Sequence, residues 1–263
     1  RGTVRIGVAL LAVLAWPHAV VGETSHEPQP IPFQAPELLT FEELKALSVN
    51  PYSRGESRAK YEALWTTPFI SNEAFLGGTR PHRPSDPRLG AFLRVVSWNI
   101  EQSLHWDAAT EAFTNADAFA QRIDRRKARP GSRRFEQVLA ERALLEEADV
   151  LILQEIDLGM KRSGYRPTAK DLAQALGMNY AYVPIYVEVD PVQLGTEPIR
   201  FKEGPVDVEA TTYFAVDPSR YKGLFGVAVL SRYPIVSVET FRLFHQAYDW
   251  YWQEKKKIAF LER

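Results

Sequence analysis

Two segments of the chain each join a run of apolar residues to polar side chains that could do chemistry. In RVVSWNIEQ (Arg94–Gln102) an apolar strand pattern is followed by Asn99 and Glu101, and in DVLILQEID (Asp149–Asp157) four apolar residues are followed by Gln and Glu155. A carboxylate at the end of an apolar strand must be solvated, paired or bound to a cation, because an isolated buried charge is costly. The sequence therefore predicts a site at the ends of two strands of one sheet.

The chemistry open to this pair is that of a metal site. A hard divalent cation such as Mg²⁺ prefers oxygen ligands and often takes only one or two carboxylates, so Glu155 is a candidate ligand. Asn99 could ligate the metal through its amide oxygen or hydrogen-bond a phosphate through its nitrogen. Each residue also has an ordinary interpretation, since Glu155 could simply reach solvent and Asn99 could form a turn. The two strand ends together favour a site more strongly than either alone.

Three weaker candidates follow the same segments. Arg162 could bind a phosphate, because a guanidinium group matches its oxygens, or it could be an exposed loop charge. Asp157 could support Glu155, although a turn residue is the favoured interpretation. The run QRIDRRKARPGSRR (Gln121–Arg134) has seven basic residues and one acidic residue. It could steer a polyanion, but such runs are more often solvated loops or helix faces.

Strands that alternate with helices must position these residues, which indicates an α/β fold. The hydrophobic patterns predict a strand where each candidate segment begins and a helix between them. We expect strands at Leu93–Trp98, Val150–Leu153, Tyr180–Val189, Gly226–Leu230 and Ile235–Leu243, and helices at Glu56–Trp65, Phe135–Glu147 and Thr168–Leu176, the last with Thr168 as N-cap and Gly177 past its end.

The chain divides into three parts. Residues 1–22 have basic residues, an apolar run and then small residues, which is the layout of a secretory signal peptide. Residues 23–91 look like an N-terminal extension with a Pro-rich linker and short helices, in which Thr40 and Glu43 form a capping-box pattern. Thr66–Gly90 is rich in Pro and Gly, which predicts a surface loop. Residues 92–263 form the main domain.

Composition excludes several classes of protein. The chain of 263 residues is 45% hydrophobic and 25% charged, as in ordinary globular proteins. It has no cysteine, so disulfides, thiolate metal sites and cysteine nucleophiles are excluded. The net charge of −1 gives no overall basic field of the kind that nucleic-acid-binding proteins carry.

Four motifs carry a resemblance to a known family. The segments VVSWNIE, ADVLILQEIDLG, DLAQALGMNYAY and GVAVLSRYPI, in this order, resemble the endonuclease/exonuclease/phosphatase superfamily from about Phe92 to Arg263. The pair WN and LQE is the most specific part. The resemblance implies a four-layered α/β sandwich, with two packed mixed sheets flanked by helices. It also implies phosphoester hydrolysis with Mg²⁺ or Mn²⁺, with Glu155 as the main metal ligand and Asn99 beside it as the second catalytic residue.

The chain departs from the family pattern in two places. Gly226-Val227-Ala228 stands where the family usually has Gly-Asn-Ala, so a polar contact to the substrate is missing. The Gly-Asp-x-Asn and Ser-Asp-His motifs, which orient the water and contact the phosphate, do not occur before Arg263. We therefore expect the domain to be truncated at its C-terminus and residues 1–263 to be inactive by themselves.

These patterns predict an exported, metal-dependent phosphodiesterase that acts by in-line attack of water, with nucleic acid as the default substrate. An alternative is a phospholipid head group or a small phosphorylated molecule such as an inositol phosphate. The aromatic and basic segment Phe244–Lys257 would suit association with a membrane, although a loop packed on the domain is the commoner outcome. A third possibility is an inactive relative that binds a partner without hydrolysis. The expected location is periplasmic or extracellular, and no protein partner can be inferred.

Overall fold

The computed structural model describes residues 29–50, 54–188 and 216–241, and within them the chain has an α/β fold. A mixed five-stranded sheet, a two-stranded sheet and seven α-helices make up the described part, consistent with the predicted sandwich class. The helices are α1 (Phe41–Val49), α2 (Glu56–Thr66), α3 (Glu73–Leu76), α4 (Trp106–Thr114), α5 (Ala116–Arg122), α6 (Arg133–Glu146) and α7 (Thr168–Leu176), with the 3-10 helices η1 (Glu101–Ser103) and η2 (Lys161–Ser163). The strands are β1 (Phe69–Ser71), β2 (Ser85–Asp86), β3 (Gly90–Ala91), β4 (Val95–Asn99), β5 (Val150–Leu158), β6 (Asn179–Val187) and β7 (Leu224–Ser231).

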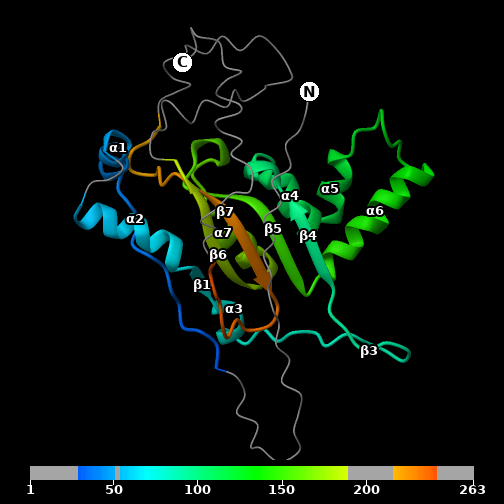
Figure 1. Ribbon diagram of the computed structural model, residues 1–263. Helices are drawn as coiled ribbons and strands as arrows, with labels where there is room; N and C mark the ends of the chain where they lie inside the picture. The colour runs from blue at the N-terminus through cyan, green and yellow to red at the C-terminus, as the bar shows by residue number, and fades with distance from the viewer. Residues whose placement is uncertain (1–28, 51–53, 189–215, 242–263) are drawn as a thin grey trace, which may run out of the picture.

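The order of strands in the main sheet decides where the candidate site lies. The strands follow one another as β1-β6-β7-β5-β4 (Figure 1). β4 and β5 are parallel, and the other neighbouring pairs are antiparallel. The helices α4, α5 and α6 connect the two parallel strands, as a parallel crossover requires. Because β4 and β5 run in the same direction, their carboxyl ends lie at the same edge of the sheet.

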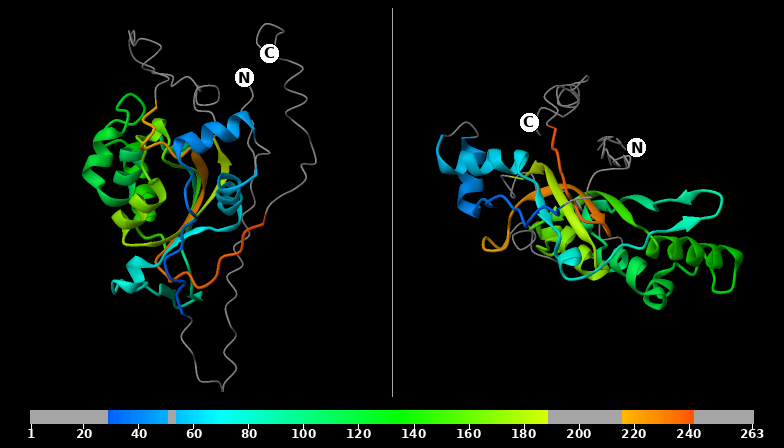
Figure 2. Two further views of the ribbon diagram at one scale, coloured as in Figure 1. Left: turned by 90° about the vertical axis from the view of Figure 1, so that its left-hand side faces the viewer. Right: turned by 90° about the horizontal axis from the view of Figure 1, so that it is seen from below.

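The helices form two groups. Figure 1 shows α4, α5 and α6 on the side of the sheet where β4 and β5 lie, and α1 and α2 beside β6. The second view of Figure 2 places these two groups at opposite ends of the sheet. Helix α7 contacts β5, β6 and β7, and it buries Leu172 and Ala173. These helices cover apolar residues of the central strands, such as Leu151 and Leu153, which are fully buried.

The segment assigned to an N-terminal extension contributes to the same core. Leu44 and Leu64 of α1 and α2 belong to one hydrophobic cluster with Leu151 of β5. Strand β1 pairs with β6, with Phe69 opposite Tyr182. The prediction of a surface loop over Thr66–Gly90 is wrong for β1, because an apolar strand of three residues is too short to give a periodic pattern and acquires its partner only in the folded chain.

Helix ends follow the predicted capping patterns in part. The capping box of α1 is confirmed, since Thr40 and Glu43 each bond the other's backbone N–H. The predicted bounds of α7 are confirmed, and Gly177 ends the helix with φ 60°, a left-handed conformation that glycine adopts without a steric penalty. The prediction that Thr168 is the N-cap of α7 is wrong. Pro167 occupies that position, and the Thr168 hydroxyl donates instead to the backbone oxygen of Asp157.

The last predicted strand, Ile235–Leu243, does not form over residues 235–241. The backbone oxygen of Ile235 accepts hydrogen bonds from the backbone N–H of Ile31 (2.9 Å) and from Nδ2 of Asn72 (2.9 Å). The Ile235 N–H donates to Oδ1 of the same Asn72 (2.7 Å). A side-chain amide thus takes the place of a neighbouring strand, which the strand-like composition of this segment could not reveal.

Two predicted segments lie outside the described residues: the signal peptide at residues 1–22 and the aromatic segment Phe244–Lys257. None of the helices in the described ranges has the length and apolar character that crossing a membrane requires.

Alkaline pH is expected to unfold the domain, because its sheet buries tyrosine hydroxyls. Burial raises the pKa of Tyr180 to about 12, and the charge of Glu73 adds to the shift. An unfolded tyrosine titrates near pH 10. The folded-state pKa is the higher of the two, so this stabilisation is complete below pH about 10 and is lost as the pH rises toward 12. Circular dichroism and tyrosinate absorbance, followed together through this range, should change in one cooperative step.

The variant Tyr180→Phe removes the ionisable group and keeps the ring, so its transition should occur at higher pH than that of the wild type. Tyrosinate that forms in this range without loss of the helical signal would contradict the expectation.

Candidate functional site

The structure brings Asn99 and Glu155 together where the parallel pairing of β4 and β5 stops. β4 ends at Asn99, but β5 continues to Leu158, so the predicted end of this strand at Leu153 is wrong and Glu155 lies inside β5. The strand continues because Ile156 to Leu158 still pair with β7.

The parallel register places Asn99 opposite Gln154. Nδ2 of Asn99 donates a hydrogen bond to Oε1 of Glu155, at a distance of 2.8 Å. The contact between two side chains far apart in the sequence follows from the parallel pairing, as the strand patterns predict. The catalytic and metal-binding roles of the two residues stay predictions.

A β-bulge in β5 changes the direction in which the side chain of Glu155 points. On β5, Gln154 pairs with Val227 of β7 and Ile156 pairs with Gly226, so Glu155 falls between two ladder positions. Its φ is 60°, in the left-handed region that non-glycine residues rarely adopt. Such a conformation costs on the order of 1–3 kcal/mol and persists where the surrounding structure imposes it, often at functional sites. The bulge lets the carboxylate meet Asn99 while the residues on either side remain paired in the sheet.

The chain after Asn99 turns tightly and fixes the orientation of its amide. The amide oxygen Oδ1 accepts a hydrogen bond from the backbone N–H of Glu101 (2.8 Å). Glu101, Gln102 and Ser103 have φ values of 53°, 56° and 56°, which is a short left-handed turn. The amide oxygen therefore faces this turn and the amide nitrogen faces Glu155. This arrangement favours Asn99 as the residue that orients the carboxylate.

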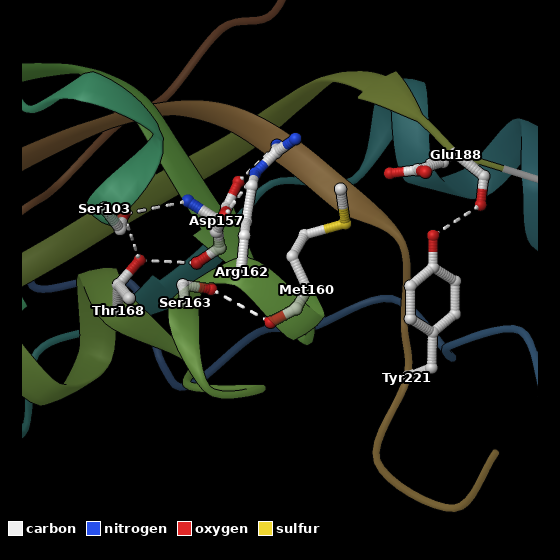
Figure 3. A network of polar contacts seen from close by, with 8 residues as sticks. All are labelled: Ser103, Asp157, Met160, Arg162, Ser163, Thr168, Glu188 and Tyr221. Atoms are coloured by element: carbon white, nitrogen blue, oxygen red, sulfur yellow. Dashed lines mark hydrogen bonds and ion pairs between the residues drawn. The ribbon is translucent and has the colours of Figure 1, made fainter. Parts of the chain in front are cut away.

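Asp157, two residues beyond Glu155, is fully buried and pairs with Arg162. The guanidinium group donates from Nε (2.9 Å) and Nη2 (2.8 Å) to the two carboxylate oxygens, as Figure 3 shows. The interpretation of Asp157 as a turn residue is wrong, because it lies inside β5. Arg162 is no simple exposed loop charge either, since only 18% of its side chain is exposed. The pair fixes η2 to the strand that carries Glu155.

Two hydroxyl groups complete the surroundings of Asp157. Oγ of Ser103 accepts from the Asp157 backbone N–H (3.2 Å) and donates to Oγ1 of Thr168 (3.2 Å). Thr168 in turn donates to the Asp157 backbone oxygen (Figure 3). The network ties the turn after Asn99 to the strand that carries Glu155.

The pKa of the Asp157 carboxyl reflects its burial and the charges around it. Burial raises the pKa of the Asp157 carboxyl, and the Arg162 guanidinium opposes that shift. The negative charge of Glu155 also raises the pKa of Asp157, to a smaller extent.

The departure at Val227 lies on the strand that pairs with β5. Val227 lies opposite Gln154 and is 7% exposed, so an apolar side chain occupies the position where the family usually has an amide. Sequence reasoning missed the neighbouring Gly226, although a single glycine inside a strand pattern is a signal of a bulge or a close backbone approach. It also missed Ser103 and Thr168, for which the sequence offers no signal, because their partners are distant in the chain.

The donor set of the site fits a hard divalent cation. Within the described ranges no group of three or more His, Cys, Asp or Glu side chains gathers as a metal cluster. Mg²⁺, however, often takes one or two carboxylates and keeps several waters. The Glu155 carboxylate is partly exposed, and Asn99 supplies its only side-chain hydrogen bond from the described residues. A carboxylate that is held by one oxygen, with the other left for a ligand, is suited to this role.

Most of the basic run Gln121–Arg134 is exposed to solvent, which is the interpretation that the sequence favoured. Arg126 is 89% exposed and pairs with Asp124. Arg122 is the last residue of α5, and it pairs with Glu111 of α4.

Comparison with known proteins gives one match. A family model described as "Endonuclease/Exonuclease/phosphatase family" matches residues 96–259, which include both Asn99 and Glu155. A search of curated proteins and a search of solved structures found no match.

Proposed function

Because the chain belongs to the endonuclease/exonuclease/phosphatase family, a group of phosphoester hydrolases that commonly use divalent metals, we propose that it is a metal-dependent phosphodiesterase. The observation that carries the proposal is the hydrogen bond between Asn99 and Glu155, at the point where the parallel pairing of β4 and β5 stops. The backbone of Glu155 is strained at a bulge, and its side chain is partly exposed. Such a residue is a candidate for function.

In the proposed mechanism Glu155 holds Mg²⁺ or Mn²⁺, and Asn99 fixes the orientation of that carboxylate. When bound, the cation screens the charge of the phosphate and stabilises the negative charge that develops in the transition state. Asn99 has a second amide hydrogen, which can donate to an oxygen of the scissile phosphate. Arg162, already oriented by Asp157, is proposed to bind the same phosphate, since a guanidinium group matches phosphate oxygens.

Rigid placement is the contribution of the sheet. Parallel strands, the bulge and the buried Asp157–Arg162 pair hold the polar groups in fixed positions before substrate binds. Preorganised groups lower the barrier because little reorganisation is needed during the reaction. In-line attack of water on the phosphorus also requires a group that orients the water and takes its proton, a role that we assign to none of the described residues.

Nucleic acid is the substrate class that we propose first, with phospholipid head groups and small phosphorylated molecules as the alternatives. Residues 1–22, if they are a signal peptide, would place the activity in the periplasm or outside the cell. Both points are proposals that rest on the sequence patterns.

Metal dependence tests the proposed function. The full-length protein should hydrolyse a phosphodiester such as bis(p-nitrophenyl) phosphate with Mg²⁺ or Mn²⁺. EDTA should abolish the activity, and excess Mg²⁺ should restore it. Parallel assays with single-stranded DNA, sphingomyelin and inositol phosphates identify the preferred class.

Failure to hydrolyse any of these phosphoesters with any divalent cation would contradict the proposal. It would favour the alternative of a binding module that does not catalyse hydrolysis.

A further inference from the structure

The connection between α5 and α6 concentrates positive charge in one part of the surface. Residues Arg122–Arg134, called here the basic segment, include seven basic residues and one acidic residue, Asp124. The segment therefore has a net charge of +6, in a chain whose total charge is −1. The rest of the chain is acidic overall, so a polyanion would be attracted to the basic segment in particular.

Local hydrogen bonds give the basic segment an ordered backbone. The backbone oxygen of Asp124 accepts from the N–H groups of Lys127 and Ala128, at 2.9 Å each. The N–H of Ser132 donates to the backbone oxygen of Arg129 (3.0 Å). Ala128 is 4% exposed and packs the middle of the segment against the domain. The charged side chains are thus presented by a surface of defined shape.

Most of the positive charges in the basic segment have no counterion in the part of the chain that the structure describes. Arg122 pairs with Glu111, and Arg126 pairs with Asp124. The remaining basic side chains are exposed and form no ion pair with a described carboxylate: Arg125, Lys127, Arg129, Arg133 and Arg134. Like charges that are clustered in this way repel one another, so the cluster does not stabilise the fold.

Two of these charges occupy an unfavourable position in a helix. Arg133 and Arg134 are the first two residues of α6. The N-terminus of a helix carries a partial positive charge, so cations in the first turn are destabilising and acidic residues are preferred there. Departures from such local rules are expected at functional surfaces, where another requirement outweighs stability. The two arginines are therefore candidates for a role in binding.

The basic segment lies toward the end of the sheet that carries the candidate site. Helix α6 ends shortly before the amino end of β5, and its 14 residues span about 21 Å, so its first turn lies toward the other end of the strand. Figure 1 shows the connection between α5 and α6 at the outer edge of the molecule, at the end toward which β4 points. A polymer bound at Glu155 can extend to this edge, whereas a small substrate cannot.

We propose that the basic segment binds the phosphate backbone of a nucleic-acid substrate, away from the bond that is cleaved. The proposal rests on the proposed function, because it takes nucleic acid as the substrate of the candidate site. Six of the seven basic residues are arginines. The planar guanidinium group binds phosphate oxygens with two parallel hydrogen bonds, which makes arginine well suited to this contact.

The composition of the basic segment favours nucleic acid over a lipid surface. Segments that lie on membranes combine basic residues with exposed Trp, Phe or Leu. None of the large exposed hydrophobic residues in the described ranges belongs to the basic segment. The segment also contains no aromatic residue that could stack on a base. We therefore expect contacts to the phosphate backbone alone, with strong dependence on salt and little preference for base sequence.

Binding is measured without hydrolysis, by fluorescence anisotropy of the full-length protein with a labelled oligothymidylate of about 16 nucleotides in EDTA. The double variant Arg133→Gln/Arg134→Gln should bind about tenfold more weakly than the wild type. Its plot of log affinity against log salt concentration should be shallower by about 1.4, as for the loss of two contacts to a single strand. The melting temperature should equal or exceed that of the wild type, because positive charge is removed from a helix N-terminus.

Arg83→Gln/Arg88→Gln is the matched control. Both arginines are exposed and the variant loses the same charge, but they flank β2, which precedes the amino end of β4. The affinity of this variant for the oligonucleotide should stay within about twofold of the wild type, because distant charges are screened by salt. An unchanged affinity in Arg133→Gln/Arg134→Gln, or an equal loss in both double variants, overturns the proposal.

Kinetics test the link between the basic segment and the substrate. The KM for the oligonucleotide is compared with the KM for bis(p-nitrophenyl) phosphate, which is too small to extend from Glu155 to the segment. Arg133→Gln/Arg134→Gln should raise the ratio of the first KM to the second by about tenfold. A ratio equal to that of the wild type overturns the proposal.

The outcomes separate this proposal from the proposed function. If the wild type hydrolyses no phosphoester but its binding of the oligonucleotide is weakened in Arg133→Gln/Arg134→Gln, the basic segment stands as a nucleic-acid-binding surface and the proposed function fails. If hydrolysis occurs and the double variant binds the oligonucleotide like the wild type, the proposed function stands and this proposal fails. Vesicles of phosphatidylglycerol and phosphatidylcholine test the lipid alternative. Binding to these vesicles and not to the oligonucleotide, lost in the double variant, overturns the proposal and assigns the segment to a membrane surface.

Discussion

Glu155→Gln should lower kcat for phosphodiester hydrolysis by about 10²- to 10³-fold, since a metal ligand supplies several kcal/mol of transition-state stabilisation and each 1.4 kcal/mol is about tenfold. Glutamine keeps the shape of the side chain and an oxygen that can accept from Nδ2 of Asn99. It removes the negative charge that would attract a cation. The loss should therefore appear in activity and in metal binding.

The free energy of unfolding should change little in this variant. Glu155 is partly exposed, and its bulged backbone stays the same, so a change within about 1 kcal/mol is expected. Titration with Mn²⁺, followed by electron paramagnetic resonance, measures the affinity for metal directly. The affinity for Mn²⁺ should fall together with kcat.

Glu101→Gln is the matched control for Glu155. Glu101 is an exposed glutamate that also has positive φ and lies two residues after Asn99, and its backbone N–H donates to Oδ1 of Asn99. This variant should retain its activity within about twofold, since a surface substitution has small effects. Wild-type turnover in Glu155→Gln, or an equal loss in both variants, would show that the role given to Glu155 is wrong.

Gly226→Ala should destabilise the domain by about 3 kcal/mol, because the added methyl group has no room. Its Cβ would lie 2.2 Å from the backbone oxygen of Val183 and 2.9 Å from Cα of Pro184. Both contacts are to the backbone of β6, which cannot move aside like a flexible side chain. The two strands would have to separate.

Gly226 also lies where two bulges meet. On β5 the register shifts at Glu155, and on β6 it shifts between Pro184 and Tyr186, with Gly226 at the pairing position beside both shifts. A displaced β7 would therefore change the bulge that directs Glu155. The activity of the Gly226→Ala variant should fall by more than the loss of folded protein alone would cause.

Urea unfolding measures the effect, with Gly131→Ala as the control. A Cβ at Gly131 would meet nothing within 4 Å, but the φ of Gly131 is 77°. Alanine there has only the cost of a left-handed backbone, about 1–2 kcal/mol. Gly226→Ala should thus have the lower midpoint of the two. A free energy of unfolding within about 1 kcal/mol of the wild type would contradict the steric argument.

Local patterns in the sequence determined much of the fold. The bounds of α7, its terminal Gly177 and the capping box at Thr40 follow from contacts within a few residues, which the sequence displays directly. The meeting of Asn99 and Glu155 was also predictable, because parallel strands joined by helices run in the same direction side by side, although β5 continues past Glu155 to Leu158. The family was visible in the same motifs.

Tertiary structure alone decided the features that depend on distant partners. The left-handed conformation of Glu155 arises where β5 meets Gly226 of β7, and nothing in the segment LQEID shows it. Asp157 is buried because Arg162, Ser103 and Thr168 satisfy its polar atoms, whereas the sequence favoured a turn. Bulges and buried ion pairs are set by which strands and helices become neighbours, and hydrophobic periodicity records only which face of an element is buried.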